Sequence, residues 1–404
     1  MNKLKVGVIF GGCTVEHEVS IITAVQAMNH MDSEKYDIIP IYISKDRIWY
    51  TGKMLMDMDV YKDFDSLKKY AKKVMLVRTE DGFFLQKTNG LFRSNVTELD
   101  VAFPIVHGKG VEDGSIVGLL DSVGIPYVGS GILGSALGQD KVVQKQVLEM
   151  NGISVPKYTW FYDTEYLEDN LGILKNIKKL KYPVIVKPAN LGSSVGISVA
   201  HNEEEIDACI TEAIRYDNKI VVETMIPNLM EVNCSVLGNY EHQETSAIDE
   251  MLTKNDFLTF NDKYIGGGKG KLKGSKKFVG AGKMSTSDRV IPARISKDLE
   301  IKVQDLAKQT FKAMNLSGVA RIDFLINKKT DEVYVNEPNT IPGSLAFYLW
   351  NHVGKDYKTL LDEMITMAIK SYKNNAKKVS SFESNILSNF NGSKCLKGIK
   401  NKLR

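Results

Sequence analysis

The sequence predicts an α/β protein built from three successive domains and a short C-terminal tail. Two observations lead to this fold class. Short apolar runs typical of buried strands alternate with segments whose apolar residues recur at helical spacing. The chain also has 404 residues, which is too long for one hydrophobic core at about 100–200 residues per domain.

The predicted first domain, residues 1–128, alternates strands with a helix. Strand candidates cover 5–10, 36–44 and 99–108, and apolar residues at helical spacing mark a helix over 16–31. The first strand runs directly into two glycines, as a buried strand before a tight loop does. Because strands that alternate with helices usually pair in parallel, we expect a parallel sheet in this domain.

The predicted second domain, residues 129–230, opens with a helix over 132–152. Strand candidates at 182–188 and 197–200 flank a Gly/Ser-rich loop and predict a hairpin. In a Walker P-loop the glycines lead into a helix instead, so that site is excluded. The remaining elements predicted for this domain are strands at 157–163 and 219–226 and a helix at 202–216.

The predicted third domain, residues 231–375, contains a pair of strands at 318–327 and 332–339 joined by a short Lys-Lys-Thr-Asp turn. It also carries a long basic loop over 263–289. Its other predicted elements are a strand at 231–239 and helices at 295–315 and 355–373. The tail over 376–404 is rich in Lys, Ser and Asn and is expected to lie outside the domains.

The charge of the chain is concentrated in two places. The formal net charge is only +4, from 53 basic and 49 acidic residues. Residues 263–289 hold eight Lys or Arg and one acid, and so do residues 371–404. Each stretch therefore carries +7 and the rest of the chain carries −10. Such clustering indicates local handling of anions rather than a generally basic surface.

Several classes of protein are excluded by composition. No apolar run approaches the ~20 residues of a membrane span. The N-terminus has no signal-peptide cleavage pattern, so we expect a cytoplasmic protein. The cysteines stand far apart without CxxC spacing, which argues against a disulfide framework or a zinc site. The first strand is not followed by GxGxxG, which argues against dinucleotide binding.

Oxygen-bearing side chains gather on the predicted strand pair. Asp323 stands in an apolar stretch of the first strand, while Glu337 and Asn339 are two apart on the second and share a face. An exposed polar face of a sheet would explain them. A buried unpaired carboxylate is costly, however, and Mg²⁺ prefers oxygen ligands, so we favour a magnesium site.

A second set of residues suits a phosphate group. Lys187 ends an apolar run, and the loop that follows contains Gly192, Ser193, Ser194 and Gly196. A lysine supplies a point charge, the glycines let the backbone approach an anion, and the hydroxyls donate hydrogen bonds. A flexible surface hairpin has the same composition, so from the motif alone both interpretations stay open.

Two further loops follow strands of the first domain. In GGCTVEHEVS, the amides at the start of the helix could bind an anion, or Glu16 and Glu18 could cap the helix. In HGKGVEDGS, the side chains of His107, Glu112 and Asp113 follow a strand of the expected parallel sheet. Ligands often bind where the strands of a parallel sheet end at their carboxyl ends. A solvated loop with no ligand could contain the same charged residues, so both interpretations stay open.

Taken together, these motifs resemble those of the D-alanine–D-alanine ligases of the ATP-grasp superfamily. The resemblance runs from about residue 4 to about residue 370. It is carried by GGCTVEHEVS, HGKGVEDGSIVGLLDSVGIPYVGSG, Asp140-Lys141, VKPANLGSSVGIS, EVNCSVLGN, FNDKY, ARIDF and NEPNTIPGS. It implies an ATP-grasp fold behind an N-terminal pre-ATP-grasp domain. It also implies an ATP-dependent ligase that joins two D-alanines for peptidoglycan synthesis through an acyl phosphate.

The resemblance also implies the residues that handle ATP and metal. Those expected to bind ATP are Lys141 and Lys187 at the phosphates, Glu223, Thr224 and Ile226 at the adenine, Glu231 at the ribose and Lys263 at the γ-phosphate. Those expected to hold two Mg²⁺ ions, or Mn²⁺ in their place, are Asp323, Glu337 and Asn339.

The amino-acid substrates have their own implied residues. Glu16 would bind the ammonium group of the first D-amino acid, supported by hydrogen bonds from Ser193 and Tyr264. His107 would lie near the same substrate. Arg321 and the backbone amide of Gly343 would stabilise the oxyanion of the tetrahedral intermediate.

The chain departs from the family in two places. The family has a Ser-Leu pair that receives the carboxylate of the second amino acid. Without gaps, Tyr348 falls on that serine and Leu349 keeps the leucine, so either Ser344 or the Tyr348 hydroxyl could be the donor. The stretch over 265–286 holds seven glycines and is expected to be a lid that is longer and more basic than usual.

Two alternative functions remain beside that of a D-alanine–D-alanine ligase. One is an ATP-grasp ligase for another amino-acid pair, and the other is a non-catalytic nucleotide sensor. The presence of Arg321, Asp323, Glu337 and Asn339 argues against the sensor. We expect D-amino acids as small-molecule partners, no nucleic-acid or membrane partner and, by resemblance, a homodimer.

Overall fold

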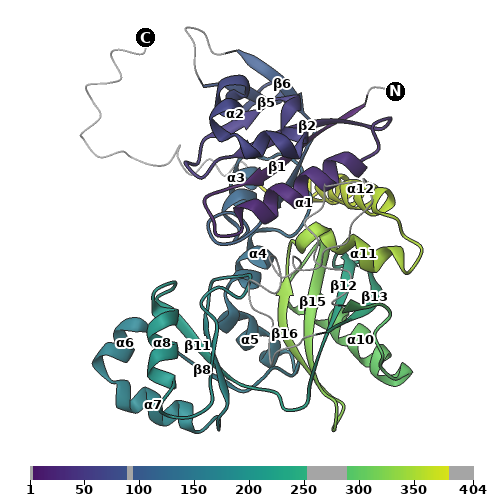
Figure 1. Ribbon diagram of the computed structural model, residues 1–404. Helices are drawn as coiled ribbons and strands as arrows, with labels where there is room; N and C mark the ends of the chain where they lie inside the picture. The colour runs from purple at the N-terminus through teal and green to yellow at the C-terminus, as the bar shows by residue number, and fades with distance from the viewer. Residues whose placement is uncertain (1–2, 89–93, 253–288, 382–404) are drawn as a thin grey trace, which may run out of the picture. The chain divides into compact units, whose positions relative to one another are not determined.

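The computed structural model describes residues 3–88, 94–252 and 289–381. Residues 1–369 form one compact unit and residues 370–404 a second. Three β-sheets with their helices make up the first unit (Figure 1). Lys263, Tyr264 and the expected lid over 265–286 lie outside the described residues.

The first sheet has seven strands in the order β6-β5-β4-β3-β2-β1-β7. Their bounds are β1 Leu4–Gly11, β2 Tyr36–Ile43, β3 Trp49–Thr51, β4 Lys72–Thr79, β5 Gly82–Lys87, β6 Asn95–Leu99 and β7 Val101–Val106. The central strand β1 pairs in parallel with β2 and β7, which confirms the parallel sheet expected from the alternation. Strands β3 to β6 extend it by antiparallel pairing, which the sequence analysis did not predict.

The sequence contains a local signal for the antiparallel hairpin of β4 and β5. Strand β4 ends at Thr79 and β5 begins at Gly82, and these two residues face each other across a two-residue connection. Asp81 ends that connection and Gly82 follows it, and an Asp-Gly pair is a turn signal because glycine readily adopts positive φ. Gly82 has φ of 142° here. Asp81-Gly82 is therefore the local sequence signal for this hairpin.

Helices cover both faces of the first sheet. They are α1 His17–His30, the short 3-10 helices η1 Lys53–Met56 and η2 Met58–Lys62, α2 Phe64–Tyr70 and α3 Ser115–Val123. Buried residues of α1 such as Ala24 and Met28 pack with Val6, Val8 and Phe10 of β1. Ile9 and the α3 residue Leu120 belong to a separate cluster on the opposite face.

The second sheet has four strands in the order β10-β9-β11-β8. Its strands are β8 Tyr158–Tyr162, β9 Val184–Pro188, β10 Ser198–Ala200 and β11 Lys219–Thr224, and its helices are α4 Ile132–Gln139, α5 Lys141–Met150, α6 Asp163–Glu168, α7 Asn170–Lys178 and α8 Ile206–Ile214. β9 and β10 form the predicted antiparallel hairpin. One apolar cluster joins residues of α6, α7 and α8 to one face of the sheet (Figure 1).

The opposite face of this sheet meets α5 through a row of alternate residues on β11. Lys219 pairs with Asp140 at 2.8 Å, Val221 packs on Val142, and Glu223 pairs with Lys145 at 3.2 Å. Side chains two apart on a strand share a face, which is why these contacts repeat along β11. Lys187 lies opposite Val221 in the register and therefore points to the same face.

The expected helix over 132–152 is two helices, α4 and α5. Asp140 separates them in an extended conformation, and its Oδ1 accepts hydrogen bonds from the amides of Val142 and Val143 at 2.9 and 3.1 Å. An aspartate that satisfies the first free amides begins a helix rather than continuing one. The prediction of one continuous helix was wrong at this residue.

The third sheet has five strands in the order β14-β13-β12-β15-β16, all antiparallel. Its strands are β12 Leu229–Gly238, β13 Gln243–Met251, β14 Arg289–Val290, β15 Gly318–Asn327 and β16 Glu332–Asn339. The helix α10 (Lys297–Ala313) packs on one face, where Val232, Ile322 and Phe324 are buried. The other face carries the polar residues Arg321 and Asp323.

A β-bulge in β16 changes which residues share that polar face. Asp323 pairs with Glu337 but the next residue, Phe324, pairs with Val335, so Asn336 is an extra residue. If the same residues alternated regularly, with no bulge at Asn336, Glu337 and Asn339 would lie on the same face as the buried Val335. The bulge sends the two polar side chains to the opposite face instead.

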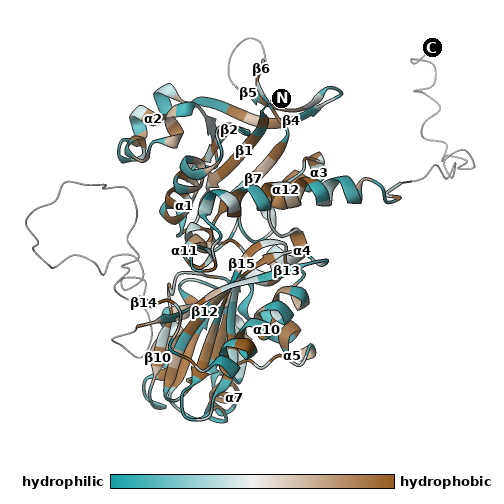
Figure 2. Ribbon diagram, turned by 90° about the vertical axis from the view of Figure 1, so that its right-hand side faces the viewer, coloured by the Kyte–Doolittle hydropathy of each residue, from teal (hydrophilic) through white to brown (hydrophobic). Residues whose placement is uncertain are grey.

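The chain returns to the first sheet after β16. A 3-10 turn η4 (Gly343–Ala346) and α11 (Phe347–Asn351) lead to α12 (Tyr357–Asn375). Apolar residues of α12 recur at helical spacing, as brown and teal residues around it show (Figure 2). Leu360, Leu361 and Ile365 belong to the same core cluster as Val6 and Val8 of β1.

Candidate active site

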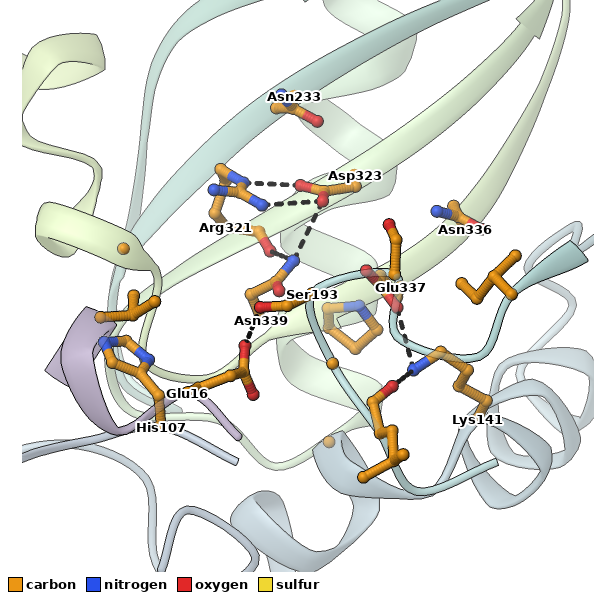
Figure 3. Close-up of a pocket in the computed structure, with 18 of the residues that line it drawn as sticks. Glu16, His107, Lys141, Ser193, Asn233, Arg321, Asp323, Asn336, Glu337 and Asn339 are labelled. Carbon is orange, nitrogen blue, oxygen red and sulfur yellow. Dashed lines mark hydrogen bonds and ion pairs between the residues drawn. The ribbon is translucent and has the colours of Figure 1, made fainter. Parts of the chain in front are cut away.

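A cavity of about 500 Å³ is lined by residues of all three predicted domains. Eighteen of the residues singled out from the sequence line it: Glu16, Glu18, His107, Glu112, Lys141, Lys187, Gly192, Ser193, Ser194, Ile226, Glu231, Arg321, Asp323, Glu337, Asn339, Gly343, Ser344 and Tyr348. The structure thus brings together residues that are separated by more than 300 positions in the chain. Figure 3 shows several of them around the cavity.

The loop between β9 and β10 closes tightly over Glu16. The Ser193 hydroxyl donates a short hydrogen bond to the Glu16 carboxylate (Figure 3). A side chain at position 192 would place its Cβ 2.7 Å from Glu16 Oε2, so a residue larger than glycine would displace the Glu16 carboxylate. Ser193 and Ser194 have positive φ values of 55° and 59°. The Gly/Ser composition therefore fits a loop wrapped against a carboxylate, not a free surface hairpin.

Lys141 lies at the start of α5 and faces two oxygens. Its Nζ donates to the carbonyl of Leu191 at 2.7 Å and lies 3.3 Å from Glu337 Oε2 (Figure 3). The first contact holds the lysine against the β9–β10 loop, and the second joins it to the third sheet. This lysine therefore connects two of the three sheets at the cavity.

Behind the cavity, Glu223 is buried between two lysines. Its side chain accepts from Lys187 Nζ at 2.9 Å and pairs with Lys145 Nζ at 3.2 Å. Burial would raise the pKa of Glu223, but the two lysines outweigh it and hold that pKa below its usual value. The Glu223 carboxylate thus fixes the lysine that lines the cavity. Lys145 is a member of this group that the sequence analysis missed.

The third sheet contributes Arg321, Asp323, Glu337 and Asn339. Arg321 donates to both oxygens of Asp323, from Nε at 2.7 Å and from Nη2 at 2.8 Å, and Asn339 Nδ2 donates to Asp323 Oδ2 at 3.1 Å (Figure 3). Burial alone would lower the pKa of Arg321, yet the adjacent Asp323 raises it well above its usual range. Asp323 therefore has a compensating cation on its own strand, which the sequence analysis did not foresee.

This donor set fits a hard divalent cation. Asp323 and Glu337 face each other across β15 and β16, and Asn339 adds an amide to the same face. Mg²⁺ prefers a few carboxylate and amide oxygens together with substrate phosphates and water. Among the described residues, no three His, Cys, Asp or Glu side chains form a metal site by themselves. An ion bound here would therefore depend on Asn339 and on ligands from a substrate.

His107 and Glu112 are two titratable groups in the loop after β7. Burial, with the nearby charge of Arg321, lowers the pKa of His107 to about 4, so the imidazole is neutral near pH 7. Burial, with the charge of Glu16, raises the pKa of Glu112 to about 7. Glu112 accepts hydrogen bonds from the Gly108 amide, the Thr340 hydroxyl and the Ile341 amide. Through these hydrogen bonds, Glu112 links the loop after β7 to the segment that precedes Gly343.

The segment over 343–349 holds the residues proposed for the second substrate. Ser344 donates its amide to Thr23 Oγ1 at 3.1 Å and its hydroxyl to Gln26 Oε1 at 2.7 Å. Tyr348 lines the cavity, while its hydroxyl oxygen is buried. Leu349 is completely buried and does not line the cavity.

Glu223 and Thr224, which were expected to bind the adenine, do not line the cavity either. The Glu223 carboxylate is engaged by the lysines, and the Thr224 hydroxyl donates to the carbonyl of Leu180 at 3.2 Å. Ile226 does line the cavity.

Comparison with known proteins places the chain in a family. The family model described as "D-ala D-ala ligase N-terminus" matches residues 5–130, and that described as "D-ala D-ala ligase C-terminus" matches residues 147–366. The chain belongs to the D-alanine–D-alanine ligase family. It is therefore an ATP-dependent ligase with the ATP-grasp fold.

Two curated members of the family are similar over nearly their whole length. One is the D-alanine–D-alanine ligase of Thermosipho melanesiensis, with 41% identity over 95% of this chain and 98% of the relative. Another is that of Thermoanaerobacter sp. strain X514, with 39% identity over 92% of this chain and 98% of the relative.

Solved structures of family members are similar as well. The D-alanine–D-alanine ligase from Coxiella burnetii superposes with a TM-score of 0.76 at 28% identity, covering 93% of this chain and 97% of that one. The VanG D-Ala:D-Ser ligase from Enterococcus faecalis superposes with a TM-score of 0.73 at 29% identity, covering 91% and 100%. Within the described ranges, no helix of this ligase is both long and apolar enough to cross a membrane.

Proposed function

We propose that this ligase joins two molecules of D-alanine at the expense of ATP, for peptidoglycan precursor synthesis. The observation that carries the proposal is one cavity lined by two lysines, the carboxylates of β15 and β16 and the Glu16–Ser193 pair. The lysines suit a triphosphate, the carboxylates a metal and Glu16 an ammonium group. Each of these groups is required when a carboxylate is activated and then attacked by an amine.

The order of chemistry follows from leaving groups. A carboxylate is a poor acyl donor at neutral pH because oxide would have to leave. Transfer of the γ-phosphoryl group to one carboxylate oxygen gives an acyl phosphate, from which phosphate leaves readily. The amine of the second D-alanine then attacks the acyl carbon, phosphate departs, and the amine loses a proton to give the peptide bond.

On the nucleotide side, Lys141 and Lys187 would hold the phosphates. Both lie on the cavity wall, and the contacts with Leu191 and Glu223 fix their positions before a ligand arrives. Ile226 would pack against the adenine and Glu231 would bind the ribose. Glu223 and Thr224 would act through backbone groups at the end of β11, because their side chains are engaged elsewhere. Lys263 is proposed for the γ-phosphate.

Asp323, Glu337 and Asn339 would hold Mg²⁺, with two ions as the proposed number and Mn²⁺ as a substitute. The metal would neutralise charge that spreads over the transferred phosphoryl group. The neighbouring Lys141 and Arg321 are cationic, so they add positive charge around the same carboxylates.

On the amino-acid side, Glu16 would bind the ammonium group of the first D-alanine. Ser193 orients that carboxylate, and Tyr264, which directly precedes the expected lid over 265–286, is proposed to support it. Neutral His107 lies beside the same substrate without repelling its ammonium group. Arg321 and the Gly343 amide would stabilise the oxyanion formed when the amine attacks.

The second candidate is a ligase for another acceptor, such as a D-Ala–D-X ligase. It is favoured by Tyr348, which stands where the family has serine, and by the likeness to a D-Ala:D-Ser ligase. A non-catalytic nucleotide sensor is less well supported, because the cavity retains Arg321 and both carboxylates.

Phosphate release, screened over pairs of D- and L-amino acids with ATP and Mg²⁺, tests the proposal. We expect release with D-alanine alone and recovery of the dipeptide by mass spectrometry. Absence of release with D-alanine would reject the leading function. Release only with D-alanine plus a different amino acid would support the second candidate.

Other features of the chain complete the proposal. We propose that residues 1–128, 129–230 and 231–375 are its three domains, with the buried face of α12 contributing to the core of the first. We further propose a cytoplasmic homodimer, since ATP is the substrate and the resemblance implies a dimer. The basic tail over 376–404 has no role assigned.

A further inference from the structure

A buried lysine on α5, Lys145, lies behind the cavity wall and has no part in the function proposed above. Its side chain is 1% exposed, and it does not line the cavity. Lysine is almost never fully buried unless its ammonium group is paired. The Nζ atom of Lys145 lies 3.2 Å from Glu223 Oε1, and within the described ranges Glu223 is the one carboxylate at salt-bridge distance from it. This pairing therefore accounts for the burial of Lys145.

The Glu223 carboxylate is shared by two lysines, one at each oxygen. Its Oε2 accepts a hydrogen bond from Lys187 Nζ at 2.9 Å, while its Oε1 faces Lys145. The side chain of Glu223 is 1% exposed, so water has little access to replace either lysine. With two ammonium groups on one carboxylate, the three side chains carry +1 rather than 0. Lys187 is the member of this group that lines the cavity.

The carboxylate and the ammonium group of Lys145 stabilise each other in their charged forms. Burial lowers the pKa of Lys145, and the charge of Glu223 opposes that shift. A buried carboxylate that loses its counter-ion is strongly unfavourable, because neither water nor another charge compensates it. Glu223 therefore requires at least one lysine at all times.

A phosphate group that binds Lys187 competes with Glu223 for the same ammonium group. With Lys145 in place, Glu223 keeps one cation when Lys187 turns toward the phosphate. Without Lys145, Glu223 and Lys187 would form a closed neutral pair, and Lys187 would have to leave Glu223 with no counter-ion. The second lysine thus makes the first one available.

We propose that Lys145 is a positioning residue for ATP, which neutralises Glu223 so that Lys187 can bind the phosphates. The proposal rests on the role given to Lys187 above, and it adds a residue that does not touch the nucleotide. The effect of Lys145 then passes through Glu223 to Lys187. It concerns only the part of the ligand that carries phosphate.

Calorimetric titration of the full-length protein with ATP and Mg²⁺, in the absence of amino acids, tests the proposal. Lys145→Met keeps an unbranched side chain and removes the ammonium group. We expect the affinity for ATP to fall about tenfold or more, since Glu223 retains Lys187. The affinity for adenosine, which has no phosphate, should stay within about twofold of the wild type. Should Lys145→Met fail to fold, Lys145→Gln serves in its place, because glutamine keeps a donor for Glu223 without the charge.

The double variant Lys145→Met/Glu223→Gln separates this role from a merely structural one. The competing carboxylate is then absent as well, so Lys187 is again available to the phosphates. The affinity for ATP should return to within about threefold of the wild type. A packing defect at position 145 would instead persist in the double variant, which would contradict the proposal.

Lys219→Met is the matched control. Lys219 pairs with Asp140 at 2.8 Å in the same contact between β11 and α5, and no described contact joins it to Lys187. Asp140 remains stabilised by the amides at the start of α5. The affinity for ATP should therefore equal that of the wild type. An equal loss in Lys219→Met would indicate a general effect of positive charge and would overturn the proposal, as would unchanged ATP affinity in Lys145→Met or an equal loss for adenosine.

Lys187→Met distinguishes this inference from the function on which it rests. Weaker ATP binding in Lys187→Met with unchanged binding in Lys145→Met would reject the role of Lys145 and keep that of Lys187. Unchanged binding in both variants would reject both roles. Failure to ligate D-alanine is separate, because the titration contains no amino acid.

Discussion

At the scale of single residues, charge pairing at the cavity differs from what the sequence suggests. Asp323 in an apolar strand argued for a metal, because an unpaired buried carboxylate is unfavourable. The structure supplies Arg321 two residues earlier, whose side chain lies on the same face and makes a bidentate pair. The carboxylate is therefore satisfied without a metal, and the case for Mg²⁺ rests on the whole oxygen set and on the family.

The metal assignment predicts a large effect of Glu337→Gln. The amide keeps the shape of the side chain but removes the charge that would hold Mg²⁺, so we expect ATP-dependent ligation to fall at least about 100-fold. The measurement is phosphate release with D-alanine over a range of Mg²⁺ concentrations. Glu332→Gln, at the exposed far end of the same strand, is the control and should behave as the wild type. Unchanged turnover in Glu337→Gln would remove the metal assignment.

Glu112 gives a prediction about pH. Its pKa is raised to about 7 in the folded chain and returns to about 4.5 on unfolding, so the folded state binds the proton more tightly. Its contribution to stability is therefore fully present below pH 4.5 and is lost as pH rises through 7. Relative to Glu112→Gln, which cannot titrate, wild-type protein should lose roughly 1–3 kcal/mol between these limits.

Melting temperatures of the two proteins, recorded from pH 5 to pH 8, measure this effect. The wild-type curve should fall relative to that of Glu112→Gln as pH rises. Parallel curves would show that Glu112 is ionised at its ordinary pKa despite its position. Asp113 in the same loop provides a control. The substitution Asp113→Asn should leave the change in melting temperature between pH 5 and pH 8 as it is in the wild type.

At the scale of secondary-structure elements, one extra residue in β16 decides which side chains reach the cavity. The strand reads Val333, Val335, Glu337 and Asn339 at alternate positions, and strict alternation would put all four on the face packed against α10. The bulge at Asn336 shifts the last two to the polar face. Sequence reasoning placed Glu337 and Asn339 together but had no means to see this change of face.

Deleting Asn336 tests whether the extra residue can be removed without moving Glu337. The ladders on either side of the bulge would then join, with Phe324 still opposite Val335 and Asp323 still opposite Glu337. We therefore expect Glu337 to stay on the polar face and ligation, measured as phosphate release, to persist in the deletion variant. Asn336→Ala keeps the bulge and removes one 3.3 Å hydrogen bond to Lys187, and it should remain folded with a melting temperature close to that of the wild type. Loss of ligation on deletion alone would show that the bulge itself, and not only the alternation around it, positions Glu337.

At the scale of the whole molecule, the two ends of the described chain share one core. Residues of α12 pack with β1, although about 350 positions separate them in the sequence. The strongly periodic apolar residues of 355–373 predicted the helix, but periodicity gives no partner for its apolar face. The first sheet is therefore stabilised by the last helix.

Leu361→Ala tests this long-range packing. Leu361 is completely buried, and its truncation should cost about 2–5 kcal/mol. Amides of β1 and β7 should then exchange with solvent at least about tenfold faster in hydrogen-exchange mass spectrometry, while those of the second sheet should be unaffected. Lys358→Ala on the exposed side of α12 removes an ion pair with Asp32 and should cost less than about 1 kcal/mol. Uniform exchange changes in all three sheets would contradict a local role for α12.

The sequence by itself determined the α/β class, the Gly/Ser hairpin, the paired strands around Asp323 and most of the cavity residues. These features depend on local periodicity, turn chemistry and motif spacing, all of which are visible in the amino-acid sequence. Tertiary structure decided the antiparallel extension of the first sheet, the partner of α12, the Arg321–Asp323 pair and the burial of Glu223 between two lysines. Such outcomes depend on which distant side chains meet, and only packing in three dimensions sets those contacts.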